Sequence, residues 1–282
     1  MASVSRVNLV KNFIVSNGIS SKDSFDAGTS AQSQAANFLA ADTRPVPGDV
    51  SSLEGYKFME RYVLALFYFA MNGANWVYPL NFVDLQLDTC SWNFPVPIGN
   101  NGRILPTGAF CAQQGEPVNA LAIDQNNLAG PIPSEVGRLT ALRLIELQGN
   151  QEVSGSIPDT FQFLTNIRII QVNNNAMTGT IPTWIDKLSN LDAFVLSNNK
   201  MDGSIPTQMR TLTNLWFLGL DDNLFTGNLD NLMTLTNLQG LYLEDNRFQH
   251  RVDDTLCKDM RSLVHLDISD NQLIGSVPVH LL

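Results

Sequence analysis

Residues 194–199, Phe-Val-Leu-Ser-Asn-Asn, decide the fold because their pattern returns along the second half of the chain. Equivalent segments end at Asn126, Asn150, Asn175, Asn223, Asn246 and Asn271, so the asparagines recur at intervals of 24, 25, 24, 24, 23 and 25 residues. Two apolar residues one position apart point to the same side of a short strand. The asparagine that closes the strand can bond the backbone of the neighbouring turn. Because one such unit cannot bury its apolar edge alone, the pattern predicts an α/β solenoid with about seven short parallel strands.

A second element follows the asparagine. It reads Leu-Ala-Gly-Pro-Ile-Pro at 128–133, Met-Thr-Gly-Thr-Ile-Pro at 177–182 and Met-Asp-Gly-Ser-Ile-Pro at 201–206. This resembles the plant-type (LxGxIP class) leucine-rich repeat of receptor-like-kinase ectodomains and polygalacturonase inhibitors. The resemblance implies a right-handed horseshoe with a concave parallel sheet and a second short sheet beside it. That second sheet is expected to fade in the fifth and sixth repeats, where Leu229-Asp230 and then Val252-Asp253 replace Ile-Pro.

Three regions are predicted: N-terminal helices and linker over 1–57, a capping region over 58–118, and seven repeats over 119–282 without a C-terminal cap. Apolar residues at helical spacing predict two short helices within 5–41, and the Pro-, Gly- and Ser-rich segment 43–55 is predicted to be a linker. Residues 58–72 form the clearest helix, and its apolar residues wrap nearly all round it. We expect this helix to cover the exposed edge of the first repeat.

The capping region contains Cys90-Ser-Trp92-Asn93 and, just before the first repeat, Cys111. The plant-type cap has a Cys-x-Trp-x-Gly-Val-x-Cys signature, so the resemblance implies a disulfide between Cys90 and Cys111, with Cys257 left as a free thiol. Here an insertion at 94–110 separates the two cysteines. The order of helix, Gly-x-x-Trp, Cys-x-Trp-Asn, Cys and repeats is also similar to leucine-rich repeat proteins of diatoms and related algae.

The printed chain stops within a repeat. An open solenoid end exposes apolar side chains and unpaired strand edges. We therefore expect the natural protein to continue, and the last repeat to fray or self-associate in isolation. The residues that lack a covering repeat are Leu273, Val277, Leu281 and Leu282.

The composition bounds the partners and the compartment. A formal charge of −10 and a pI of about 4.6 argue against general affinity for nucleic acid or an anionic membrane. The acidic surface favours basic or neutral partners, or serves solubility alone. The apolar run 62–71 is too short to insert into a membrane. The cap cysteines suggest an extracellular or membrane-anchored ectodomain, whereas the lack of a signal peptide and of any Asn-x-Ser/Thr sequon favours an intracellular or organellar setting.

No catalytic motif occurs in the sequence, so no enzymatic activity and no cofactor are expected. With three histidines in the chain, a histidine metal site is not expected either. The nearest constellation is Tyr242, Glu244, His265 and Asp267, which neighbouring strands place on one surface. His265 and Asp267 could form an acid–base pair, or these residues could be exposed polar contacts.

Strand alternation predicts which side chains the concave face offers to a partner. An apolar stripe containing Leu144, Ile169 and Phe217 is expected beside a polar, partly acidic one, and such a grouping is typical of a binding surface. We therefore expect the chain to recognise a protein or peptide there. The alternative is a structural or surface-binding role toward cell-wall carbohydrate or ice. The expected contact residues are Glu146, Gln171, Val195, Phe217, Tyr242, Glu244, His265 and Asp267.

Overall fold

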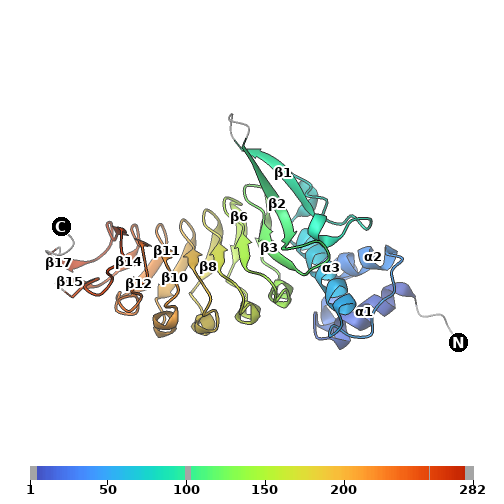
Figure 1. Cartoon of the computed structure of the whole chain (residues 1–282), viewed down its shortest axis with the longest axis horizontal. Helices are drawn as coiled ribbons and strands as arrows, with labels where there is room; N and C mark the ends of the chain where they lie inside the picture. Colours follow the sequence, from blue (N-terminus) through green and yellow to red (C-terminus); the bar gives the residue numbers. More distant parts are fainter. Residues whose placement is uncertain (1–4, 99–102, 254, 277–282) are drawn as a thin grey trace.

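The computed structural model describes residues 5–98, 103–253 and 255–276 of the chain. The described residues form an elongated molecule with helices at one end and stacked repeats running away from them (Figure 1). One strand from each repeat enters a parallel sheet, in the register that the asparagine spacing predicts, so the predicted solenoid is confirmed. These strands are β3 (Val118–Ala122), β5 (Leu144–Glu146), β7 (Ile169–Gln171), β9 (Ala193–Val195), β11 (Phe217–Gly219), β13 (Gly240–Tyr242) and β16 (His265–Asp267).

The residues that close each strand explain how the repeats lock together. The Asn199 side chain donates to the carbonyls of Leu196 on its own strand, at 2.9 Å, and of Val172 on the previous one, at 3.0 Å. Its oxygen accepts from the Met177 amide at 2.9 Å. Asn150, Asn223, Asn246 and Asn271 make equivalent bonds. One buried amide therefore satisfies backbone groups of two repeats that would otherwise lack partners.

A second short sheet runs beside the first, as predicted. Its strands are β4 (Ala129–Pro131), β6 (Glu152–Gly155), β8 (Ala176–Gly179), β10 (Lys200–Ser204), β12 (Leu224–Gly227) and β14 (Arg247–Phe248). The prediction that this sheet fades in the fifth repeat is wrong, because β12 pairs with β10 over three residues. The paired residues precede Leu229-Asp230, so the loss of Ile-Pro does not reach them. The sheet does end at the two-residue β14, and β15 (Arg251–Val252) pairs separately with β17 (Ile274–Gly275).

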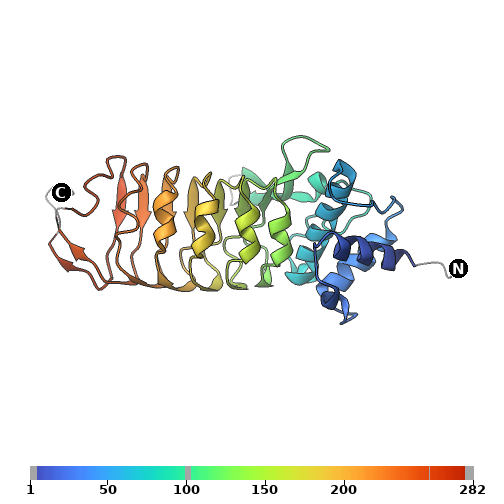
Figure 2. The same cartoon turned by 90° about the horizontal axis from the view of Figure 1, so that it is seen from below.

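The return path of each of the first four repeats contains a short 3-10 helix. These helices lie side by side in Figure 2. These are η5 (Ser134–Arg138), η6 (Asp159–Phe163), η7 (Thr183–Lys187) and η8 (Thr207–Thr211). Each follows a proline, whose ring fixes φ at the entry to the helix. Another asparagine row ties the return paths together: Asn190 donates to the Thr165 carbonyl and Asn214 to that of Ser189, both at 2.8 Å.

Three α-helices precede the repeats: α1 (Arg6–Ser16), α2 (Ala31–Ala41) and α3 (Leu53–Ala70), with a 3-10 turn, η1 (Lys22–Phe25), between the first two. The predicted helix at 58–72 begins five residues earlier than expected, so the end of the predicted linker is helical. Ser52 caps α3 by accepting from the Gly55 amide at 3.0 Å. Gly55 is required there, because a Cβ would lie 1.7 Å from the Asp49 carbonyl oxygen.

As expected, α3 covers the edge of the first repeat. The Ala129 amide donates to the Met71 carbonyl at 3.3 Å, and the Val118 amide donates to the buried Glu60 carboxylate at 2.6 Å. Asn126, the first repeat asparagine, bonds the backbone N–H and C=O of Tyr78 instead of a preceding repeat. The cap thus supplies the partners that a further repeat would supply.

The insertion between the cap cysteines forms a hairpin that the sequence did not predict. Its strands, β1 (Asn93–Ile98) and β2 (Arg103–Cys111), pair in antiparallel fashion, and β2 pairs with β3, so the main sheet contains nine strands. Figure 1 shows the hairpin rising from the sheet above the cap. Two 3-10 turns, η2 (Gly73–Asn75) and η3 (Thr89–Ser91), connect α3 to it.

At the other end, Leu273 is half-buried and Ile274 is 64% exposed. The further residues expected to be uncovered, Val277, Leu281 and Leu282, lie outside the described residues.

Candidate binding surface

The parallel sheet separates two sets of side chains. In β11 and the residue after it, Leu218 and Leu220 point into the core and are fully buried, whereas Phe217 lies half-buried on the opposite face. The same alternation holds in β13, where Leu241 and Leu243 are buried. The face away from the core is the concave face that the sequence predicts.

Aromatic rings of the fifth, sixth and seventh repeats contact one another in a row that begins at Trp216, just before β11. Trp216 contacts Phe217 edge-on with ring centroids 5.7 Å apart, and Phe217 lies 5.4 Å from Tyr242. Tyr242 stacks on His265 at 6.5 Å with an interplanar angle of 21°. We call these four residues the aromatic row. Trp216 is 44% exposed, so the row presents apolar surface to solvent.

Two glycines make room for the aromatic row. A Cβ on Gly240 would lie 2.8 Å from the Phe217 ring and 3.3 Å from the Tyr242 ring. A Cβ on Gly219 would lie 2.8 Å from the Ser197 hydroxyl and 3.5 Å from the Phe217 ring. Both glycines have ordinary negative φ, so the need here is for space and not for backbone freedom. The rings can therefore lie down on the sheet and approach one another.

Carboxylates border the row. Asp221 and Glu244 follow β11 and β13, and Asp267 ends β16; we call these three the acidic edge. The Ser197 hydroxyl donates to Asp221, and the Ser269 amide and hydroxyl donate to Asp267 at 3.0 and 2.6 Å. Glu244 differs, because its Oε2 is buried and has no hydrogen-bond partner among the described residues. Burial, together with the charges of Asp221, Asp267 and Asp222, raises the pKa of the Glu244 carboxyl above its ordinary value.

The structure brings five of the predicted contact residues together and sets two apart. Tyr242, Glu244, His265 and Asp267 lie with Phe217 around the aromatic row. Glu146 and Gln171 are half-buried on β5 and β7, in the middle of the nine-stranded sheet and separated from β11 by β9. There, burial and the nearby Asp124 raise the pKa of the Glu146 carboxyl.

Val195 does not offer the exposed apolar surface that the sequence suggested. It is only 8% exposed, because its Cγ1 and the Phe217 ring converge over Gly219 on the next strand. The prediction also omitted Trp216 and Asp221, which the row and the edge include. Their positions in the sequence could have identified them, because Trp216 stands just before and Asp221 just after the strand pattern of the repeat that contains Phe217.

His265 and Asp267, the residues of the predicted acid–base pair, have separate partners. Asp267 accepts from Ser269, His265 stacks on Tyr242, and no hydrogen bond joins the two among the described residues.

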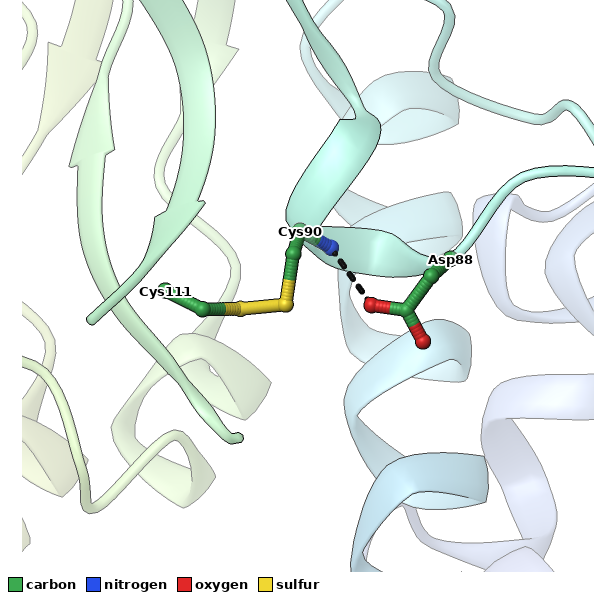
Figure 3. Close-up of side chains that lie close together, drawn as sticks. All are labelled: Asp88, Cys90 and Cys111. Atoms are coloured by element: carbon green, nitrogen blue, oxygen red, sulfur yellow. Dashed lines mark hydrogen bonds between the residues drawn. A yellow bond between two sulfur atoms is a disulfide. The ribbon is translucent and has the colours of Figure 1, made fainter. Parts of the chain in front are cut away.

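The cysteines lie as the cap resemblance implies. Cys90 and Cys111 form a disulfide with a Cα–Cα distance of 5.2 Å, which ties η3 to β2 (Figure 3). Asp88 lies close by, and its carboxylate caps η3 by accepting from the Cys90 amide at 3.0 Å. The three could resemble a metal site, but both sulfurs are consumed in the disulfide and no thiolate is available. Cys257 is a free, buried thiol, and burial raises its pKa to about 11.

Among the described residues, no helix has both the length and the apolar character needed to span a bilayer.

Comparison with known proteins agrees with this architecture. Residues 165–225 and 262–282 match family models of the leucine rich repeat. A search of curated proteins found no match.

Solved structures of plant receptors resemble the repeats. The plant peptide hormone receptor RGFR1, solved in complex with RGF2, is 33% identical over 57% of this chain and 26% of its own, with a TM-score of 0.54. The ectodomain of the Arabidopsis thaliana membrane receptor kinase GASSHO1/SCHENGEN3, in complex with CASPARIAN STRIP INTEGRITY FACTOR 2, is 32% identical over 58% of this chain and 19% of its own, with a TM-score of 0.55. This chain therefore spans about a fifth to a quarter of those ectodomains.

A plant ice-binding protein covers more of the chain, 77%, and 65% of its own length, with a TM-score of 0.65. At 24% identity it shows a shared fold alone. The repeat signature, the paired sheets and the receptor similarities agree, and the chain is a leucine-rich repeat protein of the plant type that resembles receptor-kinase ectodomains.

Proposed function

We propose that this chain is a non-catalytic recognition module that binds a protein or peptide partner on the concave face of its fifth to seventh repeats. The observation that carries the proposal is the aromatic row lying beside the acidic edge, with one buried carboxylate oxygen on Glu244 that has no partner among the residues the structure describes. Aromatic residues at the centre of an interface, with charged groups at its rim, are the usual arrangement of a binding hot spot.

The chemistry of the surface selects a basic partner. An arginine or lysine side chain can stack on Phe217 or Tyr242 while its charged end reaches Glu244 or Asp267, so cation–π attraction and ion pairing act together. The bound cation would give the Glu244 Oε2 atom the partner that it lacks. The formal charge of −10 steers a basic partner toward the chain as a whole.

The receptor similarities support the general class. Several of those ectodomains were solved with peptide ligands, RGF2 with RGFR1 and the peptide hormone IDA with the receptor kinase HAESA. The Cys90–Cys111 disulfide favours an oxidising, extracellular setting for this chain too.

A selection experiment tests the proposal. A phage-displayed random peptide library selected on the wild type should yield peptides enriched in arginine or lysine next to an apolar residue. Binding of these peptides should weaken by about 2 kcal/mol or more, which is about thirtyfold, in Phe217→Ala plus Tyr242→Ala.

The control is Phe163→Ala, which removes a solvent-exposed ring, 48% exposed, from η6 on the return path, away from the sheet that carries Phe217 and Tyr242. Peptides that bind the double variant as tightly as the wild type would place the recognition surface elsewhere.

A further inference from the structure

A separate cleft of about 870 Å³ lies where the helical cap meets the first repeats. Asn72 and Asn75, just after α3, line its cap side. Its repeat side comes from the turns that follow β3, β5 and β7, and the side chains there include Gln125, Gln148, Gln151 and Asn174. Its volume falls in the range of ligand sites, yet its lining is made mainly of carboxamides.

Several of these carboxamides are held at one end. Asn75 donates to the Asn72 oxygen at 2.6 Å, Gln148 donates to Asp124 at 2.8 Å, and Asn174 accepts from Asn198 at 2.8 Å. The opposite ends, Asn75 Oδ1, Asn72 Nδ2, Gln148 Oε1 and Asn174 Nδ2, have no protein partner in the part of the chain that the structure describes. Their orientations are fixed in advance, so a ligand would lose little entropy in ordering them.

An extra residue in the second repeat shapes the cleft. Two positions separate Asn126 from Leu128 and Asn175 from Met177, but three separate Asn150 from Val153. The Val153 amide donates to the Asn150 carbonyl at 2.8 Å and is turned away from the asparagine row. Asn175 Oδ1, which should accept from it, is consequently buried and has no partner in the described part of the chain. The longer turn places Gln151 and Glu152 in the lining. The buried hydrogen bond from the Val153 amide to Asn175 Oδ1 is therefore missing at the point where the cleft forms.

We infer that this cleft binds a neutral oligosaccharide. A carboxamide both donates and accepts hydrogen bonds, as a sugar hydroxyl does, so amides held in place can bond to successive hydroxyl groups of a saccharide. Among the described residues, the lining contains no lysine, arginine or histidine to hold a phosphate or uronate, and the carboxylate of Glu152 would repel either. Leu128 is fully buried, so a peptide would find no exposed apolar pocket for its side chains.

The test uses three neutral hexasaccharides, of β-linked glucose, xylose and mannose, titrated calorimetrically into the whole chain. We expect at least one to bind with millimolar or tighter affinity, and Gln125→Ala plus Gln151→Ala to weaken it about tenfold or more. Gln239→Ala plus Gln272→Ala, which removes two exposed carboxamides from the last repeats, should bind like the wild type. Circular dichroism confirms that each variant folds.

Any of three results would overturn the inference. The first is the absence of binding by all three saccharides at about 10 mM. The second is tighter binding of an oligogalacturonate than of any neutral saccharide. The third is a loss of binding in Phe217→Ala plus Tyr242→Ala but not in the glutamine variant, which would move the saccharide to the aromatic row. Failure here leaves the peptide selection on the concave face unaffected, because the two experiments use different variants.

Discussion

Single asparagines decide how strongly one repeat holds the next. Asn223 donates to the Leu196 carbonyl at 3.0 Å and to the Leu220 carbonyl at 3.2 Å, and accepts from the Met201 amide at 2.9 Å. Asn175 donates to equivalent carbonyls, at 2.9 and 2.8 Å, but its oxygen accepts nothing within the described residues. The two asparagines have the same place in the motif and different bonding.

We predict that Asn223→Ala lowers the free energy of unfolding by about 2 to 4 kcal/mol, because three buried backbone groups lose their partner. Asn175→Ala should cost about 1 kcal/mol less, since no donor to its oxygen is lost. Urea unfolding followed by circular dichroism measures both values. Equal costs would show that the orphaned oxygen is satisfied in solution.

We predict that Glu244 makes the proposed binding at the acidic edge depend on pH. Its pKa is raised by burial and by the neighbouring carboxylates, so in the free protein it takes up a proton at a higher pH than an ordinary glutamate. A cationic peptide binds the deprotonated form. Its affinity should therefore rise with pH and level off above the raised pKa of Glu244 in the free protein.

Calorimetric titration of a selected basic peptide at several pH values checks this expectation. The comparison is Glu244→Gln, which should bind more weakly at neutral pH and lose the part of the pH dependence above about 4.5. If the affinity has the same pH dependence in both proteins, Glu244 does not take part in binding the peptide.

At the scale of elements, the sequence predicts the features that recur in every repeat and misses those that occur in a single place. The strand alternation places Phe217, Tyr242 and His265 on one face because every repeat obeys it. The burial of Val195 depends on Gly219 in the next strand, and a one-dimensional pattern does not show that contact. The β1–β2 hairpin was missed because prolines interrupt its strands, although β1 is an edge strand, where proline is tolerated.

Helix α3 joins the cap to the first repeat through one buried carboxylate. Glu60 is fully buried and accepts from Lys57 at 3.1 Å, from the Thr89 hydroxyl and from the Val118 amide. Burial raises the pKa of this carboxyl above its ordinary value, although each partner pulls it down. One side chain thereby connects α3, η3 and β3.

We predict that Glu60→Ala lowers the free energy of unfolding by about 3 to 5 kcal/mol, because Lys57 and the Val118 amide lose their buried partner. Glu54→Ala removes an exposed carboxylate from the first turn of the same helix and should cost about 1 kcal/mol or less. Urea unfolding separates the two. A cost for Glu60→Ala as small as that for Glu54→Ala would mean that the cap is held by apolar packing alone.

At the scale of the whole molecule, each repeat contacts mainly its neighbours, so a disturbance should stay where it is made. Replacing Cys90 and Cys111 by serine opens a loop whose ends are 21 residues apart, and the chain-entropy relation gives a loss of about 3 kcal/mol. We predict that this loss is confined to the cap and the first repeats.

Hydrogen exchange resolves the prediction along the chain. Amides of β2 and β3 should exchange faster in the variant, whereas those of β11 and β13 keep their protection and the selected peptides keep their affinity. Faster exchange throughout would show that the array unfolds as one unit.

The turn residue that precedes each repeat asparagine has left-handed backbone, and its identity changes along the array. It is Gln125, Gly149, Asn174 and Asn198 in the first four repeats, and Asp222, Asp245 and Asp270 in the last three. Asparagine, aspartate and glycine all tolerate this backbone well, so the position can be neutral or negatively charged without a change in the fold. At this turn position, negative charge is consequently confined to the last three repeats. A basic chain diffusing past it would feel a torque as well as a pull, and would arrive with its cationic end already turned toward the last repeats.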